Sequence, residues 1–478
     1  MGIFITRLAE RNKFNNIFLI LLIGALIVLN RVLVFDEIGI IFSYFQFIIV
    51  LLLLLIGNTN YAVYIHLVFT ITALEFVLSP DLILHSYRTT RILGISVSTL
   101  ALIILYLSHF DYIRFLFRSN HRVKTLFYVL IIGLSIGTFG VIFLRYELVY
   151  LMADFKYWLV VFLSTHLFHI KIVQQRQNIK IYKRIIIIFL GINVFVNFLA
   201  GLLNITIDNY GGVDIFVFDS IGILSPILLL LYSKHNDTKI NALLIFVFIL
   251  GILNTYFFNT SGKGIIISSF IFLFFIYKNF FKERQITIGK VFITFIIVIT
   301  LLFLGTMNQS GKLFENKLGD SIALLSFKWV TAPMSLSTSP RDRVLELFNI
   351  STYFINNPLF TILGTGFGGY YKEDFIVNYT ANEIGGYSAY EIKTRKFIKP
   401  HSSINRVLLK FGLIGVLTWL GIILNIFNSK RSYYNDFIKY SLFTLLLLFL
   451  GYSLKVGLII GLLLNLYQFS AHKGVSPA

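Results

Sequence analysis

Residues 38–56 read IGIIFSYFQFIIVLLLLLI, a run without one charged side chain. As a helix, this run is long enough to cross the roughly 30 Å hydrocarbon core of a bilayer. The uncharged turn GNTN at 57–60 separates it from a second apolar run at 61–78. Backbone groups inside a bilayer must be satisfied by the protein itself, which favours helices for such runs. This stretch therefore predicts an integral membrane protein built from helices.

Comparable apolar runs recur along the chain on both sides of this stretch. They lie near 15–35, 92–108, 125–144, 148–170, 185–203, 215–232, 240–258, 264–280, 291–307 and 403–427. The final run, 438–470, is too long for one ordinary span, and we expect two short helices that meet around Gly451 to Lys455. The sequence thus predicts an all-α polytopic bundle of about 12–14 transmembrane helices.

The composition supports the membrane class and excludes some other classes. The chain is 57% hydrophobic and only 13% charged, whereas about a quarter of the residues in soluble domains are charged. Its formal net charge of +19 could suggest a nucleic-acid partner. The basic residues instead form short clusters between apolar runs, as in cytoplasmic loops, so we expect no nucleic acid. The absence of Cys excludes disulfides, thiol catalysis and cysteine-ligated metal.

Lysine and arginine concentrate in alternating connections between the apolar runs, which predicts the orientation. These connections hold Arg7, Arg11 and Lys13, then Arg114, Arg118, Arg122 and Lys124, then Lys171, Arg176, Lys180, Lys183 and Arg184, and later Lys430, Arg431 and Lys439. Cytoplasmic loops carry such an excess, so the N-terminus is predicted to be cytoplasmic. No small-residue cleavage signal precedes the first run, which we interpret as a spanning helix.

This orientation divides the chain into a transmembrane bundle at 1–307, a large outward loop at 308–400 and C-terminal transmembrane helices at 401–478. A loop of that length is predicted to be functional, because connections are usually only a few residues long. Ser339-Pro340 resembles a helix start, and the helix should end before Asn357-Pro358. The apolar face of this helix is expected to hold Val344, Leu347, Phe348 and Ser351.

Two arginines, Arg341 and Arg343, would occupy the first turn of that helix, where positive charge opposes the helix dipole. A helix N-terminus with two guanidinium groups suits phosphate oxygens. The alternative is a solvated face, or arginines that meet lipid head groups. Both interpretations stay open on the sequence alone.

The glycine cluster GTGFGG at 364–369 contains Gly364, Gly366 and Gly368. It lacks the strand–turn–helix context of a dinucleotide site. We predict a turn that passes close to other backbone, with anion binding by its amides as a second interpretation.

Two cations lie in other outward connections. Lys263 belongs to TSGKG at 260–264, which departs from the phosphate-loop pattern of nucleotide-binding proteins and is not an ATP site. Arg145 lies near an outward helix end. Each is either a phosphate ligand or an interfacial side chain that reaches the head groups.

His401 stands directly before the apolar run at 403–427, in the sequence KPHSS. Ser402 or Ser403 would cap the new helix and place His401 at its positive end, which favours the neutral imidazole that a general base needs. The alternative is an ordinary interfacial histidine. No metal-ligand cluster can be assigned around it. Gly412 and Gly415, further along the helix, would permit close helix packing.

Nine residues separate His401-Ser402 from Gly412, and two more separate Gly412 from Gly415. This spacing resembles the signature of bacterial O-antigen ligases. The related O-antigen polymerases share a looser version of it. Arg343, Pro358 and the glycine cluster are similar to the arginine–proline–glycine block of the same superfamily. Lys263 stands where that family has a Ser-Arg-Gly element. The family's tryptophan after the loop arginine is replaced by Leu347.

This resemblance implies a GT-C-like, metal-independent, inverting glycosyltransferase without a cofactor, in the bacterial cytoplasmic (inner) membrane with its active site on the periplasmic face. It implies an undecaprenyl-pyrophosphate-linked glycan as donor. Arg341, Arg343, Lys263 and Arg145 would bind the pyrophosphate of this donor. His401 would accept the proton of the acceptor hydroxyl. Acidic residues of the loop are alternative bases or sugar contacts: Glu373, Asp374, Glu383 and Glu391.

The leading hypothesis is a polymerase that joins lipid-linked repeats into O-antigen or capsular polysaccharide, with membrane lipids, a glycan acceptor and a chain-length regulator as partners. The alternative is a ligase that transfers finished glycan to lipid A core. A flippase or ion-coupled transporter is a hypothesis of another class. It would require charges along a midplane path and two similar halves, and the sequence contains no such repeat.

Overall fold

The computed structural model describes residues 16–33, 37–74, 85–110, 112, 120–203, 208–210, 213–215, 221–231, 238–257, 271, 274, 338–373, 389–428, 435–451 and 453–471. The predicted runs at 264–280 and 291–307 lie almost wholly outside them. The number of spanning helices therefore stays a prediction, whereas the all-α class is confirmed.

Apolar helices make up most of the described chain. They are α2 (Asn16–Val32), α3 (Glu37–Leu55), α4 (Thr59–Thr72), α5 (Val97–Leu107), α7 (His121–Phe143), α8 (Leu148–Gln174), α9 (Asn178–Leu202), the 3-10 helix η1 (Gly222–Leu231), α10 (Thr238–Phe257), α17 (Ser403–Asn428), α18 (Asn435–Leu448) and α19 (Leu454–Ala471). By length and composition, α3, α7, α8, α9 and α17 can each cross a membrane. These helices identify a multi-pass membrane protein.

The last apolar run forms two helices, α18 and α19, as predicted. They meet at Gly451, whose φ is +77°, a conformation that favours glycine. A Cβ atom there would lie 2.5 Å from Cδ of Arg406. The Arg406 guanidinium donates to the carbonyl oxygens of Leu450 and Pro400, both at 2.8 Å, and ties this turn to the start of α17.

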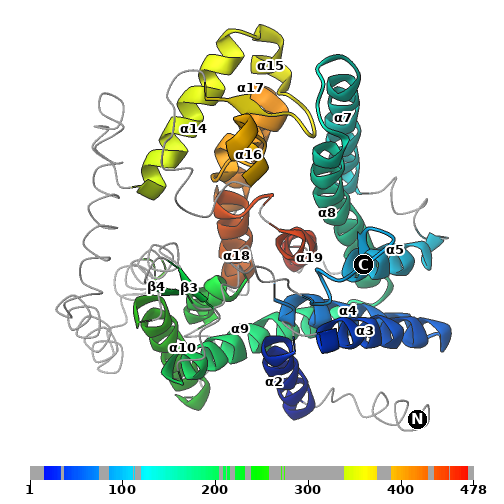
Figure 1. Cartoon of the computed structure of the whole chain (residues 1–478). Helices are drawn as coiled ribbons and strands as arrows, with labels where there is room; N and C mark the ends of the chain where they lie inside the picture. Colours follow the sequence, from blue (N-terminus) through cyan, green and yellow to red (C-terminus); the bar gives the residue numbers. More distant parts are fainter. Residues whose placement is uncertain are drawn as a thin grey trace.

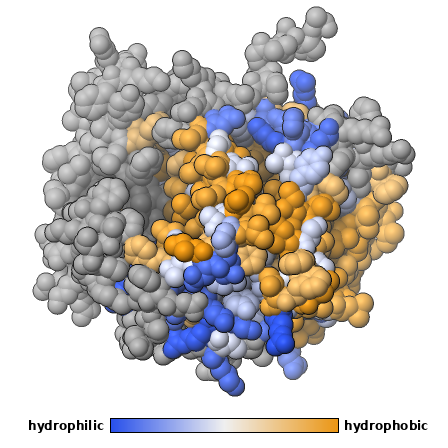
Figure 2. All heavy atoms as spheres, turned by 90° about the horizontal axis from the view of Figure 1, so that it is seen from above, coloured by the Kyte–Doolittle hydropathy of each residue, from blue (hydrophilic) through white to orange (hydrophobic). Residues whose placement is uncertain are grey.

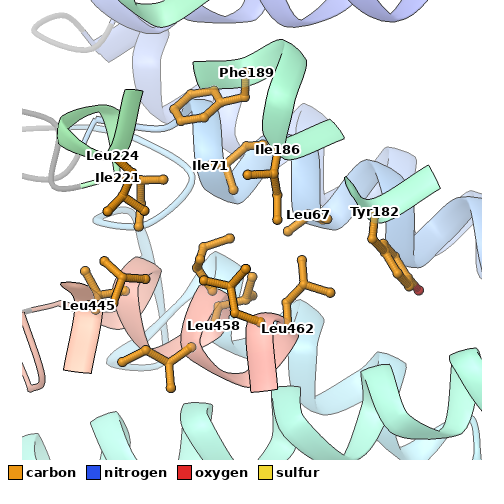
Figure 3. Packing of buried hydrophobic residues seen from close by; sticks show 14 of the residues in the cluster. Leu67, Ile71, Tyr182, Ile186, Phe189, Ile221, Leu224, Leu445, Leu458 and Leu462 are labelled. Atoms are coloured by element: carbon orange, nitrogen blue, oxygen red, sulfur yellow. The ribbon is translucent and has the colours of Figure 1, made fainter. Parts of the chain in front are cut away.

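Helix α19 lies in the middle of the molecule (Figure 1) and packs against α8. A Cβ atom on Gly461 of α19 would lie 2.1 Å from Oγ of Ser164 on α8, so glycine allows these two helices to approach closely. Figure 3 shows Leu445 of α18 and Leu458 and Leu462 of α19 opposite apolar side chains of α4, α9 and the start of η1. The opposing side chains include Leu67, Ile71, Ile186, Phe189, Leu224 and Ile221, which directly precedes η1. This cluster is the main hydrophobic core.

The described part of the loop that the sequence predicts to face outward, residues 308–400, folds into three helices and two short strands beside α17. These are α14 (Thr338–Ile355), α15 (Pro358–Leu363), β5 (Tyr371–Lys372), α16 (Ala389–Thr394) and β6 (Lys396–Phe397). Strands β5 and β6 pair antiparallel, with Tyr371 opposite Phe397. A second, smaller core contains Ile350, Phe354, Tyr371, Phe397 and Leu409 of α17. Two further hairpins pair β1 (Arg91–Ile92) with β2 (Ile95–Ser96) and β3 (Asp208–Tyr210) with β4 (Val213–Ile215).

Helix α14 begins at Thr338, one residue before the predicted start at Ser339-Pro340, and ends at Ile355, before Asn357-Pro358 as predicted. The buried face of α14 differs from the predicted face of Val344, Leu347, Phe348 and Ser351: of these residues, Leu347 and Phe348 are only half-buried. The face instead includes Val344, Leu345, Glu346, Asn349, Ile350 and Phe354. The apolar pattern misses this face because one of its buried side chains is a carboxylate with hydrogen-bond partners inside the protein.

Seen from above the view of Figure 1, apolar atoms form a band across the described surface, with hydrophilic atoms above and below it (Figure 2). Such a band is expected where a protein surface contacts hydrocarbon between two polar head-group regions. Helices α14, α15 and α17 lie together at the top of Figure 1, on the side that faces the viewer of Figure 2.

Candidate functional site

A buried carboxylate on α14 holds the histidine that precedes α17. Oε1 of Glu346 lies 2.5 Å from Nδ1 of His401. The backbone N–H of His401 also donates to both carboxylate oxygens, at 2.9 and 3.0 Å. The Glu346 side chain is 2% exposed and the His401 side chain 28% exposed. An inner carboxylate therefore fixes a histidine whose ring is accessible from outside.

The carboxylate also determines which ring nitrogen of His401 carries the proton. A carboxylate only accepts hydrogen bonds, so a neutral imidazole must place its hydrogen on Nδ1. Nε2 is then the acceptor of the ring. In hydrolases that use a serine nucleophile, an acidic side chain orients histidine in the same way. The pair in this protein thus has the arrangement of a general base with an orienting carboxylate.

Asn405 on the first turn of α17 completes the junction with α14. Its amide nitrogen donates to Oε2 of Glu346 at 3.1 Å and to the backbone oxygen of Arg343 at 2.8 Å. Ser402 caps α17 by accepting the N–H of Asn405 at 3.1 Å. The cap agrees with the sequence prediction and places His401 directly outside the helix N-terminus.

Arg343 lies on the same side of α14 as Glu346, three residues earlier. Burial lowers the pKa of the Arg343 guanidinium, while the carboxylates of Glu346 and Asp342 oppose that change. Arginine keeps its positive charge under such conditions. Arg341, at the start of the same helix, has a buried Nε atom without a hydrogen-bond partner among the described residues. Two guanidinium groups therefore lie on the first turns of the helix that carries Glu346.

The glycine cluster at 364–369 passes between α7, α8 and α17. A Cβ atom on Gly364 would lie 2.3 Å from the backbone N of Phe411, and one on Gly366 would lie 2.6 Å from the backbone N of Gly137. One on Gly368 would lie 2.7 Å from the backbone N of Leu151. All of these glycines have φ near +74°. The close backbone approach predicted from the sequence is present.

The amides of this cluster already have partners. The N–H of Gly364 donates to Phe360 O, that of Thr365 to Leu409 O and that of Gly366 to Lys410 O. The N–H of Phe367 donates to Gly133 O, that of Gly368 to Asp154 Oδ2 and that of Gly369 to Gly366 O. Anion binding by these amides, the second interpretation of the sequence, does not fit this arrangement. The segment instead connects α14 and α15 to the interior of the helix bundle.

Gly412 interrupts α17 opposite this cluster. Its φ of 61° and ψ of −158° are not helical, so α17 is kinked there. The kink leaves the carbonyl oxygens of Leu409 and Lys410 to accept the amides of Thr365 and Gly366, at 2.8 and 3.0 Å. Gly412 thus permits close packing against the loop. For Gly415, the nearest atoms that an added Cβ would meet are side-chain atoms of Phe411, from its own helix.

An ion pair anchors the same segment from α8. Nζ of Lys410 lies 2.6 Å from Oδ2 of Asp154 and donates to the backbone oxygen of Gly369 at 2.7 Å. The same carboxylate accepts the N–H of Gly368 at 2.8 Å. The Lys410 side chain is 3% exposed. This pair is structural, because each charge is satisfied within the protein.

Arg145 lies exposed on the turn between α7 and α8, with φ of 57°. The adjacent Tyr146 ring meets the Tyr370 ring edge-on, with centroids 5.5 Å apart. This turn therefore adjoins the segment that follows the glycine cluster. Within the described chain, neither a hydrogen bond nor an ion pair joins Arg145 to the histidine site.

Two of the candidate acids have structural partners. Glu373 forms an ion pair with Arg395 at 2.9 Å, and Glu391 accepts the backbone N–H groups of Ile398 and Lys399 at 2.8 and 3.4 Å. The other two, Asp374 and Glu383, lie outside the described residues, as does Lys263. In the part of the chain that the structure describes, no three His, Asp or Glu side chains gather as ligands for a metal ion.

The sequence analysis named Arg341, Arg343 and His401 as candidate site residues but did not include Glu346, the hydrogen-bond partner of His401. The available signal was its position three residues after Arg343, on the first turns of a helix predicted to carry the site. The chain matches no protein-family model, no curated protein and no solved structure. The resemblance to O-antigen ligases and polymerases therefore depends on the motif residues themselves.

Proposed function

We propose that this protein is a glycosyltransferase that uses a glycan linked to a lipid pyrophosphate, and that it polymerises undecaprenyl-pyrophosphate-linked repeats into O-antigen or capsular polysaccharide. The observation that carries the proposal is the pair of Glu346 and His401, with Oε1 2.5 Å from Nδ1. Transfer to a sugar hydroxyl requires a base that removes its proton, and a neutral histidine with a fixed tautomer suits that task.

In the proposed reaction, Nε2 of His401 accepts the proton of the acceptor hydroxyl while its oxygen attacks the anomeric carbon of the donor. A new glycosidic bond forms as the bond between that carbon and the pyrophosphate oxygen breaks. The pyrophosphate leaves with the electron pair, on the opposite side of the carbon from the attacking oxygen. The configuration at that carbon is thereby inverted. Glu346 stabilises the imidazolium that forms on His401.

The leaving group is an anionic pyrophosphate, and we assign its binding to Arg341 and Arg343. A guanidinium group forms two parallel hydrogen bonds with phosphate oxygens, which a lysine cannot do. Partial burial supports this role, because a charge in a less polar environment stabilises developing negative charge more strongly. Lys263 and Arg145 stay proposed ligands from the sequence resemblance.

The location of the pair supports a substrate held by the membrane. His401 precedes Ser403, the first residue of a helix long enough to cross a bilayer. A pyrophosphate attached to a lipid tail is confined to the polar edge of the bilayer, where such a helix begins. The charge asymmetry of the loops supports a site on the side opposite the cytoplasm. The proposed inner membrane and its periplasmic face are what the resemblance to O-antigen ligases and polymerases implies.

The direct test is incubation of purified protein with a defined lipid-linked repeat, followed by gel analysis of the products. A ladder of chain lengths is expected for the native protein. His401→Ala should produce none, whereas His121→Ala, at the exposed start of α7, should leave the ladder intact. A normal ladder from the His401→Ala protein would overturn the proposed base.

The spacing of His401-Ser402, Gly412 and Gly415 favours a ligase as the second candidate. The same assay separates the two, since a ligase adds glycan only when lipid A core is supplied and forms no ladder with the donor alone. A transporter would move the labelled donor across proteoliposomes without forming any bond.

A further inference from the structure

Helix α15 presents its apolar residues away from the protein. Leu359 is 76% exposed, Ile362 53% and Leu363 46%, and their spacing places them on one side of the helix. Ile355, at the end of α14, is 76% exposed beside them. A group of large aliphatic side chains at this degree of exposure marks a contact surface.

The side of α15 that faces the protein is no more apolar than the side that faces away. Thr361 donates its hydroxyl to the backbone oxygen of Phe354 at 3.1 Å. The Phe360 ring stacks on Tyr353, with centroids 6.0 Å apart. A loop helix in water would be expected to turn threonine outward and leucine inward. This inverted pattern is expected where the surroundings of the helix are apolar.

The exposed side of α15 continues onto a spanning helix. Helix α15 packs against α17, which is long and apolar enough to cross a membrane. On α17, Leu413 is 48% exposed, Ile414 53% and Leu417 68%. The face on which α15 and α17 lie together carries the apolar band of Figure 2.

The backbone after α15 is suited to the interior of a bilayer. Nonhelical backbone is tolerated at membrane depth only where the protein satisfies its polar groups. The amides of Thr365, Gly366 and Phe367 donate to Leu409 O, Lys410 O and Gly133 O, at 2.8 to 3.0 Å. The acceptor residues lie inside α17 and α7, both candidate spans. The segment thus passes into the bundle rather than over it.

From these observations we infer that residues 355–369 form a re-entrant segment that enters the half of the bilayer on the His401 side, with lipid acyl chains covering Ile355, Leu359, Ile362 and Leu363. Helix α15, Pro358–Leu363, is far too short to cross the bilayer, so the chain must return to the same side. This differs from the sequence expectation that all of residues 308–400 face water. The inference does not depend on the proposed enzymatic activity.

The absence of Cys from the sequence permits a direct test with single labels in the full-length protein. Leu359→Cys and Ile362→Cys would each carry an environment-sensitive fluorophore in phosphatidylcholine vesicles. Leu417→Cys on α17 serves as the lipid-facing reference, and Lys393→Cys on α16, which is exposed, as the aqueous reference. Each label is exposed to iodide in the water and, separately, to brominated acyl chains.

The labels at residues 359 and 362 are expected to match residue 417, with quenching by brominated chains several-fold stronger than at residue 393 and weak quenching by iodide. Iodide quenching of the residue-359 and residue-362 labels equal to that at residue 393 would overturn the inference. Protection from both quenchers, together with crosslinking between copies of the unlabelled Leu359→Cys variant, would also overturn it, since a second copy would then cover this surface.

Discussion

Glu346 and His401 stand 55 residues apart in sequence and join α14 to the start of α17, with Oε1 2.5 Å from Nδ1. The same carboxylate accepts the backbone N–H of His401 and the side-chain amide of Asn405. One buried acid therefore orients the histidine ring, fixes the backbone beside it and joins the loop to a spanning helix.

Glu346→Gln should reduce glycan transfer by about 10²- to 10⁴-fold, the range that a positioned general base contributes. Glutamine is similar in size but offers an N–H as well as an oxygen, so it no longer enforces a hydrogen on Nδ1 of His401. The measurement is the initial rate of transfer at saturating lipid-linked donor, with the pH dependence of that rate. Loss of kcat with little change in KM is expected.

The matched control is Glu37→Gln, the same substitution on the first turn of α3, where the side chain is exposed. Its rate should stay within about twofold of the native protein, as for most surface changes. If Glu346→Gln retained the native rate and pH profile, the carboxylate would be a structural partner of the loop only.

Arg343→Lys should lower kcat/KM by roughly tenfold or more. The lysine ammonium is a point charge, whereas the planar guanidinium group of arginine can bind two phosphate oxygens at once. Arg176→Lys, an exposed position in the connection between α8 and α9, is the matched control. The Arg343 variant should also bind inorganic pyrophosphate more weakly. Native values for both quantities would place the leaving group elsewhere.

The sequence predicted the elements with strong local signals. The two helices of the final run, the bounds of α14 and the cap of α17 each follow from apolar length, Asn357-Pro358 or Ser402. It also predicted that the glycine cluster passes close to other backbone, because few other functions require glycines at that spacing.

The sequence could not indicate which distant segments meet. Asp154 on α8 and Lys410 on α17 are far apart in the chain, and each alone could be an interfacial charge. Glu346 belongs to a face that an apolar pattern treats as solvent-exposed. The lipid-facing side of α15 was missed for a similar reason: a short segment inside a long polar loop gives no spanning signal.

Gly412→Ala should destabilise the protein by at least about 2 kcal/mol, because an alanine would be strained at φ of 61°. Its Cβ would also lie 2.5 Å from the carbonyl oxygen of Ile362. Gly421→Ala is the control, since it lies on the same helix with open space around it and alanine favours helix. Thermal unfolding in detergent should show a lower midpoint for the Gly412 variant alone. Equal midpoints would mean that the loop and α17 can separate without loss of stability.

A double-mutant cycle at Asp154 and Lys410 tests whether the ion pair holds the glycine cluster in the bundle. Lys410→Met leaves the Asp154 carboxylate without its cation and should destabilise the protein by about 3–5 kcal/mol. Asp154→Asn should also destabilise the protein, because the buried Lys410 ammonium then has only uncharged oxygen acceptors, such as that of Gly369, and no negative charge beside it. The double variant removes both charges and should be more stable than the sum of the single effects predicts, by about 1 kcal/mol or more.

The same cycle separates packing from catalysis. Since the Asp154–Lys410 pair contacts the backbone of Gly368 and Gly369 rather than the histidine site, the double variant should recover both its unfolding midpoint and part of its transfer rate. Lys393→Met, an exposed change on α16, controls for the loss of a positive charge and should alter stability by less than about 0.5 kcal/mol. Strictly additive losses would show that the two charges stabilise the protein independently. Recovery of stability without any recovery of rate would instead give the pair a direct part in transfer.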